Sequence, residues 1–216
     1  MSNEELHLIA TPTHGRVIVR RARAAASRGL LVGFHGYMET AELQMERLGG
    51  IPGASTWTLV SVQGLHCFYR GRTQQVVASW MTRQDREAAI ADNLEYVASA
   101  LDAAPHDDET PIVYAGFSQG VAMAFRAAVR GRRAAAGVIG VGGDIPPELL
   151  ADSSVTFPPV LLARGERDAW LTPDRFDADT AALRSRNVPL ASLVFDGAHE
   201  WNAAVSAAAG EFLAGL

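Results

Sequence analysis

The stretch IVYAGFSQGVAMAFRAAVR, residues 112–130, joins an apolar run to an alanine-rich run through a glycine-flanked serine. Residues 112–115 are apolar throughout, as strands covered on both faces tend to be, and residues 121–130 are typical of a helix. Between them, Gly116-Phe117-Ser118-Gln119-Gly120 fits the pattern G-x-S-x-G. A turn of this kind holds its serine in a strained conformation, with the hydroxyl above the sheet at the start of the following helix. The order strand, turn, helix therefore makes Ser118 a candidate nucleophile.

The rest of the chain alternates short apolar runs with helical patterns. Strands are expected at residues 30–34, 56–62, 112–115, 138–141, 160–163 and 192–195, and helices at 86–101, 121–130, 172–187 and 202–213. Residues 6–9 and 16–21 flank a turn with Pro12 and Gly15, which predicts an N-terminal β-hairpin. Alternating strands and helices predict a mostly parallel sheet with helices on both faces. The expected fold is α/β, a three-layer α/β/α sandwich with an N-terminal β-hairpin.

The composition limits the class of protein. The chain has 216 residues, 48% of them hydrophobic, which is enough for one sizeable core, so residues 1–216 are expected to form a single domain. The formal net charge of -5 is unfavourable for sequence-independent binding to nucleic acid. The longest run of small apolar residues, 134–143, is shorter than the ~18 residues of a membrane span, so no membrane insertion is expected. The single cysteine, Cys67, permits no intrachain disulfide, which suits the cytoplasm, and we expect a monomer or a homodimer.

A reactive serine needs a base that removes its proton, and a histidine base needs a carboxylate that fixes its tautomer. In a mostly parallel sheet these residues should follow strands, because ligand sites lie at the carboxyl ends of the strands. His199 stands directly after the last expected strand, and Asp168 follows the strand before it. Asp168 is preferred to Glu166 and Asp196, which lie closer to the ends of their strands. The chain order Ser118, Asp168, His199 is the order known from α/β-hydrolases.

Attack of a serine on a carbonyl gives an oxyanion that needs hydrogen-bond donors. One donor is expected from the backbone N–H of Gln119, directly after the serine. The other is expected from the loop after residues 30–34, where the amide of Tyr37 is the first choice and the amide of Met38 is the alternative. His35 in the same loop is predicted to be a buried hydrogen-bonding residue and not the base.

Several aromatic and apolar residues lie near these candidates along the chain. Packing is the simpler explanation of each one alone, but together they predict a pocket wall for an apolar acyl or aromatic group. The expected substrate-binding residues are Met38, Phe68, Tyr69, Trp80, Trp170 and Trp201. Arg70 and Arg72 either bind an anionic group or face solvent. Little sequence remains for a large lid over the site. The histidines show no metal-ligand spacing such as H-E-x-x-H, so neither a metal nor another cofactor is expected.

These residues resemble the α/β-hydrolase superfamily and, within it, the phospholipase/carboxylesterase family that includes acyl-protein thioesterases. The resemblance runs from about Leu30 to the C-terminus. It is carried by four segments in the family order, which are His35-Gly36, Gly116-Phe117-Ser118-Gln119-Gly120, Gly165-Glu166-Arg167-Asp168 and Ala198-His199. It implies an α/β-hydrolase fold in which the matching residues are the nucleophile, the acid, the base and the oxyanion donors.

Three features depart from the family pattern. Val121 and Ala198 stand where glycines are usual, and the loop after Gly36 continues Tyr-Met-Glu-Thr in place of a glycine-rich stretch that ends in an acidic residue. These positions lie in loops that shape the pocket, so the resemblance supports the catalytic residues but does not define the substrate.

The combined expectation is a metal-independent serine hydrolase that cleaves small carboxylic esters with short-chain or apolar acyl groups through an acyl-enzyme. Thioesterases, lysophospholipases, peptidases and perhydrolases use the same machinery, and the sequence does not separate them. A non-catalytic binding protein on the same scaffold is the alternative from another class.

Overall fold

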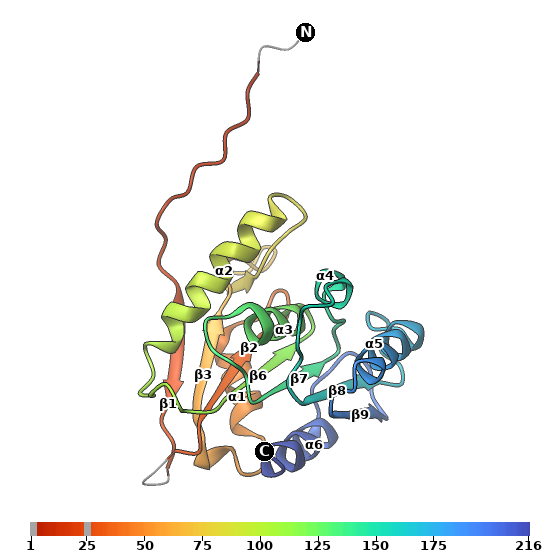
Figure 1. The fold of residues 1–216 in the computed structure, drawn as a ribbon. Helices are drawn as coiled ribbons and strands as arrows, with labels where there is room; N and C mark the ends of the chain where they lie inside the picture. The colour runs from red at the N-terminus through yellow and green to blue at the C-terminus, as the bar shows by residue number, and fades with distance from the viewer. Residues whose placement is uncertain (1–3, 24–26) are drawn as a thin grey trace.

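The computed structural model describes residues 4–23 and 27–216 (Figure 1). Its centre is a seven-stranded sheet with the order β1-β3-β2-β6-β7-β8-β9. These strands are β1 (Arg16–Arg20), β2 (Leu30–Phe34), β3 (Thr58–Gln63), β6 (Ile112–Phe117), β7 (Gly137–Val141), β8 (Val160–Gly165) and β9 (Leu190–Phe195). β1 runs antiparallel to β3, and all the other neighbours in this sheet are parallel. The prediction of a mostly parallel sheet is confirmed.

Helices cover both faces of the sheet, as Figure 1 shows. They are α1 (Ala41–Gly49), the 3-10 helix η1 (Ala54–Thr56), α2 (Arg86–Leu101), α3 (Gln119–Arg130), α4 (Pro147–Ala151), α5 (Pro173–Ser185) and α6 (Ala203–Ala214). Successive residues of β6 point to opposite faces, since Val113 belongs to a buried cluster with α1 and α6, and Tyr114 to one with α2, α3, α4 and α5. The predicted three layers are therefore observed, although α1 and α4 were not predicted. Across the described residues, no helix has the length and apolar character of a membrane span.

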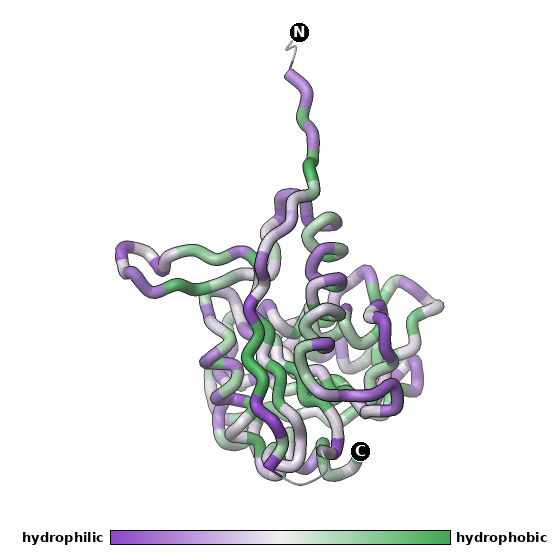
Figure 2. The backbone as a smooth tube through the Cα atoms, turned by 90° about the vertical axis from the view of Figure 1, so that its left-hand side faces the viewer, coloured by the Kyte–Doolittle hydropathy of each residue, from purple (hydrophilic) through white to green (hydrophobic). Residues whose placement is uncertain are grey.

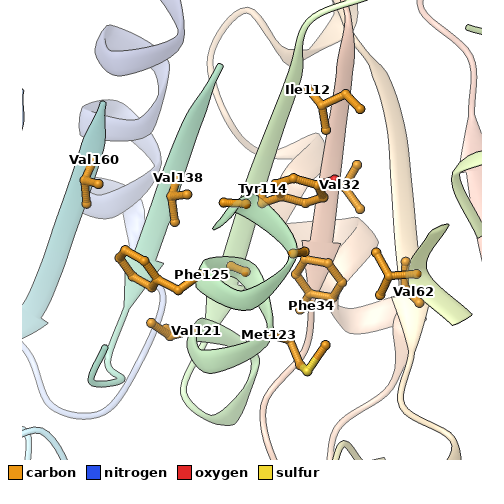
Figure 3. Close-up of a cluster of buried hydrophobic side chains, with 14 of the residues drawn as sticks. Val32, Phe34, Val62, Ile112, Tyr114, Val121, Met123, Phe125, Val138 and Val160 are labelled. Carbon is orange, nitrogen blue, oxygen red and sulfur yellow. The ribbon is translucent and has the colours of Figure 1, made fainter. Parts of the chain in front are cut away.

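The core beneath α3 fixes the turn that carries Ser118. Figure 3 shows Val121 and Phe125 of α3 lying over the sheet together with Phe34 and Tyr114. The rings of Phe34 and Tyr114 stack with their centroids 5.9 Å apart. Full burial of one such apolar side chain is worth about 1.5–3 kcal/mol. Because α3 is held against the sheet along its length, the turn that begins it is held in position as well.

The predicted N-terminal β-hairpin is wrong. Residues 6–9 belong to no strand and their apolar side chains are exposed, whereas β1 pairs with β3, with Arg16 opposite Gln63. A two-stranded hairpin is marginally stable by itself, while the edge of a packed sheet offers a row of unpaired backbone groups. Residues 16–20 pair with that edge, and a long-range pairing of this kind leaves no mark in the local sequence.

A different hairpin, not among the predicted elements, projects from the molecule. β4 (His66–Tyr69) and β5 (Val76–Ser79) pair antiparallel, and residues 66–79 form the arm that extends to the left in Figure 2 with a hydrophilic tip. We call this segment the arm. Its tip carries Arg70 and Arg72, both exposed. Its base is joined to the loop after β2, because Glu39 and Ala78 form an isolated β-bridge.

Candidate active site

Ser118, Asp168 and His199 meet at the carboxyl ends of the strands. Ser118 lies in the turn between β6 and α3, Asp168 follows β8, and His199 follows β9. Nε2 of His199 is 2.9 Å from Oγ of Ser118, and its Nδ1 is 2.9 Å from Oδ2 of Asp168. A carboxylate can only accept hydrogen bonds, so Nδ1 carries the imidazole proton and Nε2 is left to accept from the hydroxyl. The fold thus brings together three residues that lie far apart in the sequence.

The turn around Ser118 is strained. Ser118 has φ 52° and ψ -119°, and a non-glycine residue held in such a sparsely populated region costs about 1–3 kcal/mol. The flanking glycines make this turn possible, because a Cβ on Gly116 would lie 2.4 Å from the carbonyl oxygen of Gly120, and a Cβ on Gly120 would lie 2.1 Å from that of Phe34. The Ser118 N–H donates to the carbonyl of Val141 at 2.8 Å, which fixes the turn against β7.

Asp168 is buried and held by backbone donors. Its Oδ1 accepts from the N–H groups of Trp170 at 2.8 Å and Leu171 at 3.0 Å, while its Oδ2 faces the imidazole. Both oxygens are therefore used, and the carboxylate has a fixed orientation. Glu166 and Asp196, the alternatives considered from the sequence, are both exposed.

The loop after β2 leaves one of its two candidate amides unpaired. The N–H of Met38, a residue with a half-buried side chain, donates to the carbonyl of Ala78 at 3.0 Å. Within residues 4–23 and 27–216, neither the N–H of Tyr37 nor that of Gln119 has a protein acceptor. Gln119 begins α3, where the first amides have no partner inside the helix. Tyr37 and Gln119 are therefore the amides that a ligand oxygen can use, and Met38 is not.

His35 is a buried hydrogen-bonding residue, as predicted. Its Nδ1 donates to the carbonyl of Gly36 at 2.7 Å, and its Nε2 accepts from the N–H of Gly64 at 2.9 Å. Burial lowers the pKa of His35, although the bond to Gly36 opposes this effect. A neutral imidazole with both nitrogens occupied holds the loop and is not available as a base.

The side chain of Gln119 ties the serine turn to the end of the arm. Its Oε1 accepts from the N–H of Trp80 at 2.9 Å and from the Ser79 hydroxyl at 3.2 Å, and its Nε2 donates to the carbonyl of Met81 at 2.9 Å. The sequence predicted a role for the backbone N–H of Gln119 only. The side-chain role had no sequence signal, because its partners come from a distant segment.

Two of the expected substrate-binding tryptophans pack against the core, Trp80 fully buried and Trp201 half-buried. Trp80 is fully buried, its Nε1 donates to the carbonyl of His35 at 2.9 Å, and its ring meets Phe34 edge to face at 5.3 Å. Trp201 packs against the buried cluster beside α6 and donates to the Ser206 hydroxyl at 3.1 Å. The prediction that Trp80 lines a pocket is wrong, because its ring completes the core at the base of the arm. The ring and the N–H of Trp201 are likewise occupied, by packing against the buried cluster and by the bond to Ser206.

The other aromatic candidates lie at the surface. Trp170 is 73% exposed, and its ring centroid is 6.3 Å from that of His199. Phe68, half-buried on the arm, packs against Tyr37 in a tilted arrangement with the ring centroids 5.9 Å apart. Tyr69 beside it is 64% exposed. Of these three residues, Trp170 has its ring beside the imidazole, whereas Phe68 contacts Tyr37.

The loop after β7 passes behind the imidazole. Gly142 has φ 66°, and a Cβ there would lie 3.2 Å from Cε1 of His199. Three residues further on, the N–H of Ile145 donates to Oδ2 of Asp179, a buried residue of α5, at 2.9 Å. The pKa of Asp179 is raised to about 6, chiefly by burial; the Ile145 bond opposes this rise and the nearby carboxylate of Asp144 contributes to it. A titratable carboxyl therefore supports this loop from outside the site.

Residues 75–199 match the sequence profile of the phospholipase/carboxylesterase family. The match covers more than half of the chain and includes Ser118, Asp168 and His199. The chain belongs to the phospholipase/carboxylesterase family. The resemblance inferred from the sequence is confirmed. A comparison with curated protein sequences gave no match.

Solved structures of related proteins share the fold at low sequence identity. Esterase PE8 is 20% identical with a TM-score of 0.72, and the alignment covers 94% of this chain and 99% of the esterase. The Bacillus cereus carboxylesterase is 15% identical with a TM-score of 0.71, covering 93% of this chain and 94% of that one. Zea mays acyl-protein thioesterase 2 is 18% identical with a TM-score of 0.70, covering 94% and 99%. At these identities the likeness is one of fold, and it confirms the α/β-hydrolase fold.

The departures from the family pattern are accommodated by local packing. Val121 is fully buried, and Cβ atoms on Gly140 and Gly143 would lie 3.1 Å and 2.9 Å from its γ-methyl groups, so glycines opposite it make the space for its side chain. Ala198 is exposed, so its methyl group needs no space in the core. Both departures therefore fit without displacing the contact between the imidazole and the serine hydroxyl.

Proposed function

We propose that this member of the phospholipase/carboxylesterase family is a serine hydrolase that cleaves carboxylic esters of short-chain or apolar acids through an acyl-enzyme. The observation that carries the proposal is the 2.9 Å contact between Ser118 Oγ and His199 Nε2, with the imidazole oriented by Asp168. A serine is activated in this way when it contacts a base that is itself held by a carboxylate. The strained, glycine-flanked turn supports the same role, since strain of this kind collects at functional sites.

The proposed reaction has two steps with matched proton transfers. In acylation, Ser118 Oγ attacks the ester carbonyl as its proton moves to Nε2 of His199, and Nε2 then returns that proton to the departing alcohol oxygen. In deacylation, a water molecule attacks the acyl group, gives a proton to Nε2, and the serine leaves protonated. Asp168 stays ionised throughout and stabilises the imidazolium, which exists between the two transfers in each step.

The negative charge of each tetrahedral intermediate requires donors that are already in place. We assign the backbone amides of Tyr37 and Gln119 to this role, because both are unpaired within the described parts of the chain. Loss of one such donor costs about 3–4 kcal/mol in enzymes where it has been measured. Gln119 also begins α3, and the positive end of a helix favours the same charge.

The proposed acyl pocket is smaller than the sequence suggested. Trp170 and the neighbouring rings of Tyr37 and Phe68 provide aromatic surface near the site, whereas Trp80 and Trp201 are occupied in packing. These few aromatic side chains favour short-chain or aromatic acyl groups over long chains. Thioesters and lysophospholipids would react by the same steps, and the esterase PE8 and the acyl-protein thioesterase named above share the fold. We further propose a cytoplasmic monomer or homodimer, in keeping with a single cysteine.

The test is hydrolysis of p-nitrophenyl acetate and butyrate by the wild type and by Ser118→Ala. The variant should lose activity to the background level, because it lacks the oxygen that attacks the ester, and it should keep the thermal melting temperature of the wild type within a few degrees. A fluorophosphonate probe should label the wild type and not the variant. Retained activity in Ser118→Ala would refute the proposal. Esters, thioesters and lysophospholipids of graded chain length, run against the same control, then identify the substrate class.

A further inference from the structure

A largely buried ion pair lies behind the loop that carries Tyr37. Glu39 lies in this loop and Arg47 in the last turn of α1. Nη1 of Arg47 donates to Oε2 of Glu39 at 2.6 Å and Nη2 to Oε1 at 2.7 Å, and the two side chains are only 13% and 17% exposed. A bidentate pair of this kind fixes the orientation of both groups as well as their distance. The pair is therefore a rigid element and not a mobile surface contact.

The carboxylate of Glu39 also closes the loop on itself. Its Oε2 accepts from the N–H of Gly36 at 2.7 Å, so the side chain of the last residue holds the backbone of the first. A Cβ on Gly36 would lie 2.9 Å from this oxygen, which shows how closely the two approach. Burial by itself raises the pKa of Glu39, but the hydrogen bonds and charge of Arg47 outweigh it and leave the pKa below its ordinary value. Glu39 is thus ionised at neutral pH.

The loop needs such a restraint, because its backbone is strained. Met38 has φ 60°, a left-handed conformation that side chains other than that of glycine rarely adopt. The backbone of the loop is joined to the arm by two bonds, from the Met38 N–H to the Ala78 carbonyl at 3.0 Å and from the Ala78 N–H to the Glu39 carbonyl at 2.9 Å. Between the Gly36 and Met38 bonds lies the unpaired amide of Tyr37, whose own side chain is 54% exposed. The direction of this amide is therefore set by its neighbours.

The other end of the pair reaches the serine turn. The guanidinium of Arg47 lies over the ring of Phe117 at 4.1 Å, and Phe117 precedes Ser118. The Phe117 ring is in turn 5.0 Å from the ring of His199. Arg47 therefore contacts both the loop with the Tyr37 amide and the turn with the serine, and it holds the distance between them.

We propose that Glu39 and Arg47 are positioning residues, which hold the Tyr37 amide in place as an oxyanion donor relative to Ser118. This inference rests on the proposed serine hydrolase function. Neither residue touches the reacting atoms, and both act through the backbone of residues 36–39 and through Phe117. Their removal should thus weaken the binding of the tetrahedral intermediate more than the binding of the ester.

Glu42, on the same helix as Arg47, provides a matched control for Glu39. Glu42, in the first turn of α1, pairs with Arg16, but both side chains are about half exposed and neither belongs to the loop. Replacement of Glu42 removes an ion pair of the same chemical type at the surface, where such pairs contribute little. Any effect specific to Glu39 is therefore an effect of position and not of ion-pair loss in general.

The experiment compares Glu39→Ala, Glu39→Gln, Glu42→Ala and Ser118→Ala with p-nitrophenyl butyrate. We expect kcat of Glu39→Ala to fall about 10- to 100-fold with KM within about twofold of the wild type, since misplacement of a catalytic group by about 1 Å costs on the order of 100-fold. Glu39→Gln keeps an acceptor for the Gly36 N–H and should recover part of the loss. Glu42→Ala should match the wild type. Inhibition by butylboronic acid, which forms a tetrahedral adduct with a reactive serine, should weaken in Glu39→Ala by about the same factor as kcat.

Folding and function are separated in the same series. Melting curves show whether each variant is folded at the assay temperature, and fluorophosphonate titration counts the competent sites. If Glu39→Ala is not folded, the double variant Glu39→Gln/Arg47→Met, which leaves no unpaired buried charge, takes its place with the same expected loss. A folded variant with unchanged kcat, or with a rise in KM alone, overturns the positioning role even if Ser118→Ala is inactive. Activity in Ser118→Ala would instead overturn the proposed function itself.

Discussion

Replacement of Asp168 by asparagine tests how the site sets the imidazole tautomer. Oδ1 of Asp168 accepts from two backbone N–H groups, those of Trp170 and Leu171, at 2.8 Å and 3.0 Å. In Asp168→Asn the amide oxygen must take this position, because an NH2 group there would face two donors. The NH2 group then faces Nδ1 of His199, which can no longer donate. The imidazole proton moves to Nε2, so Nε2 becomes a donor to the Ser118 hydroxyl and ceases to be its base.

The size of the effect follows from this change of tautomer. A serine hydrolase with the wrong tautomer loses about 10⁴-fold in kcat, which corresponds to about 5 kcal/mol in the activation free energy. The fold should tolerate the substitution, because asparagine has the same shape and keeps both backbone hydrogen bonds. The bond between residue 168 and the imidazole is kept with its direction reversed, and the loss of the charge on the acceptor should change the free energy of unfolding by only about 2 kcal/mol. A large loss of rate with a small loss of stability is therefore expected.

The assay is the kcat for p-nitrophenyl butyrate at neutral pH, with urea unfolding of the same samples. Asp196→Asn and Glu166→Gln make the same chemical change at two exposed carboxylates close to the site, and both should retain kcat within about twofold. If Asp168→Asn kept more than a tenth of the wild-type kcat, or if either control lost as much, Asp168 would not be the residue that orients the base.

Two further predictions concern stability. Gly120→Ala should lower the free energy of unfolding by about 3 kcal/mol, because the new Cβ would lie 2.1 Å from the backbone oxygen of Phe34. The control is Gly71→Ala, which has φ 54° and no atom within 4 Å of the new Cβ and should lower it by only about 1 kcal/mol. Equal urea midpoints for the two variants would contradict this prediction. Asp179, with its pKa raised to about 6 in the folded state against about 3.9 when unfolded, contributes stability below pH 4 that is lost as the pH rises through 6. Asp179→Asn should therefore be more stable than the wild type by roughly 2 kcal/mol at pH 7.5 and not at pH 4, and a gain independent of pH would argue against ionisation as the cause.

The inner strands of the sheet, β2, β3, β6, β7 and β8, were predictable because they are buried on both faces. Runs such as residues 30–34 and 112–115 are apolar at every position, and this pattern is independent of where the neighbouring strand comes from. The N-terminal hairpin failed for the opposite reason, since residues 16–20 pair with β3 across a long separation. α1 was missed because its buried face is a narrow apolar stripe of Ala41, Met45 and Leu48 that is interrupted by the polar residue Gln44.

The site could be predicted only at the level of residue identity. Trp80 and Trp170 were both predicted to bind the substrate. Trp80 instead completes the core, whereas Trp170 is 73% exposed beside the imidazole. The choice between Tyr37 and Met38 as oxyanion donor was open in the sequence, and it depends on the bond from the Met38 N–H to Ala78. The Met38 bond is made to the arm, an element that the sequence did not reveal.

By itself, the sequence determined which chemistry is present and in what order. Ser118 between two glycines, Asp168 and His199 each follow a strand, and the carboxyl ends of parallel strands meet at one edge of a sheet, so chain order was enough to bring these three residues together. The tertiary structure decided the distances, the tautomer, the free amide and the buried pair of Glu39 and Arg47. These depend on how side chains and single N–H groups are paired between distant segments, and such pairing is set by packing in three dimensions and not by any local pattern of residues.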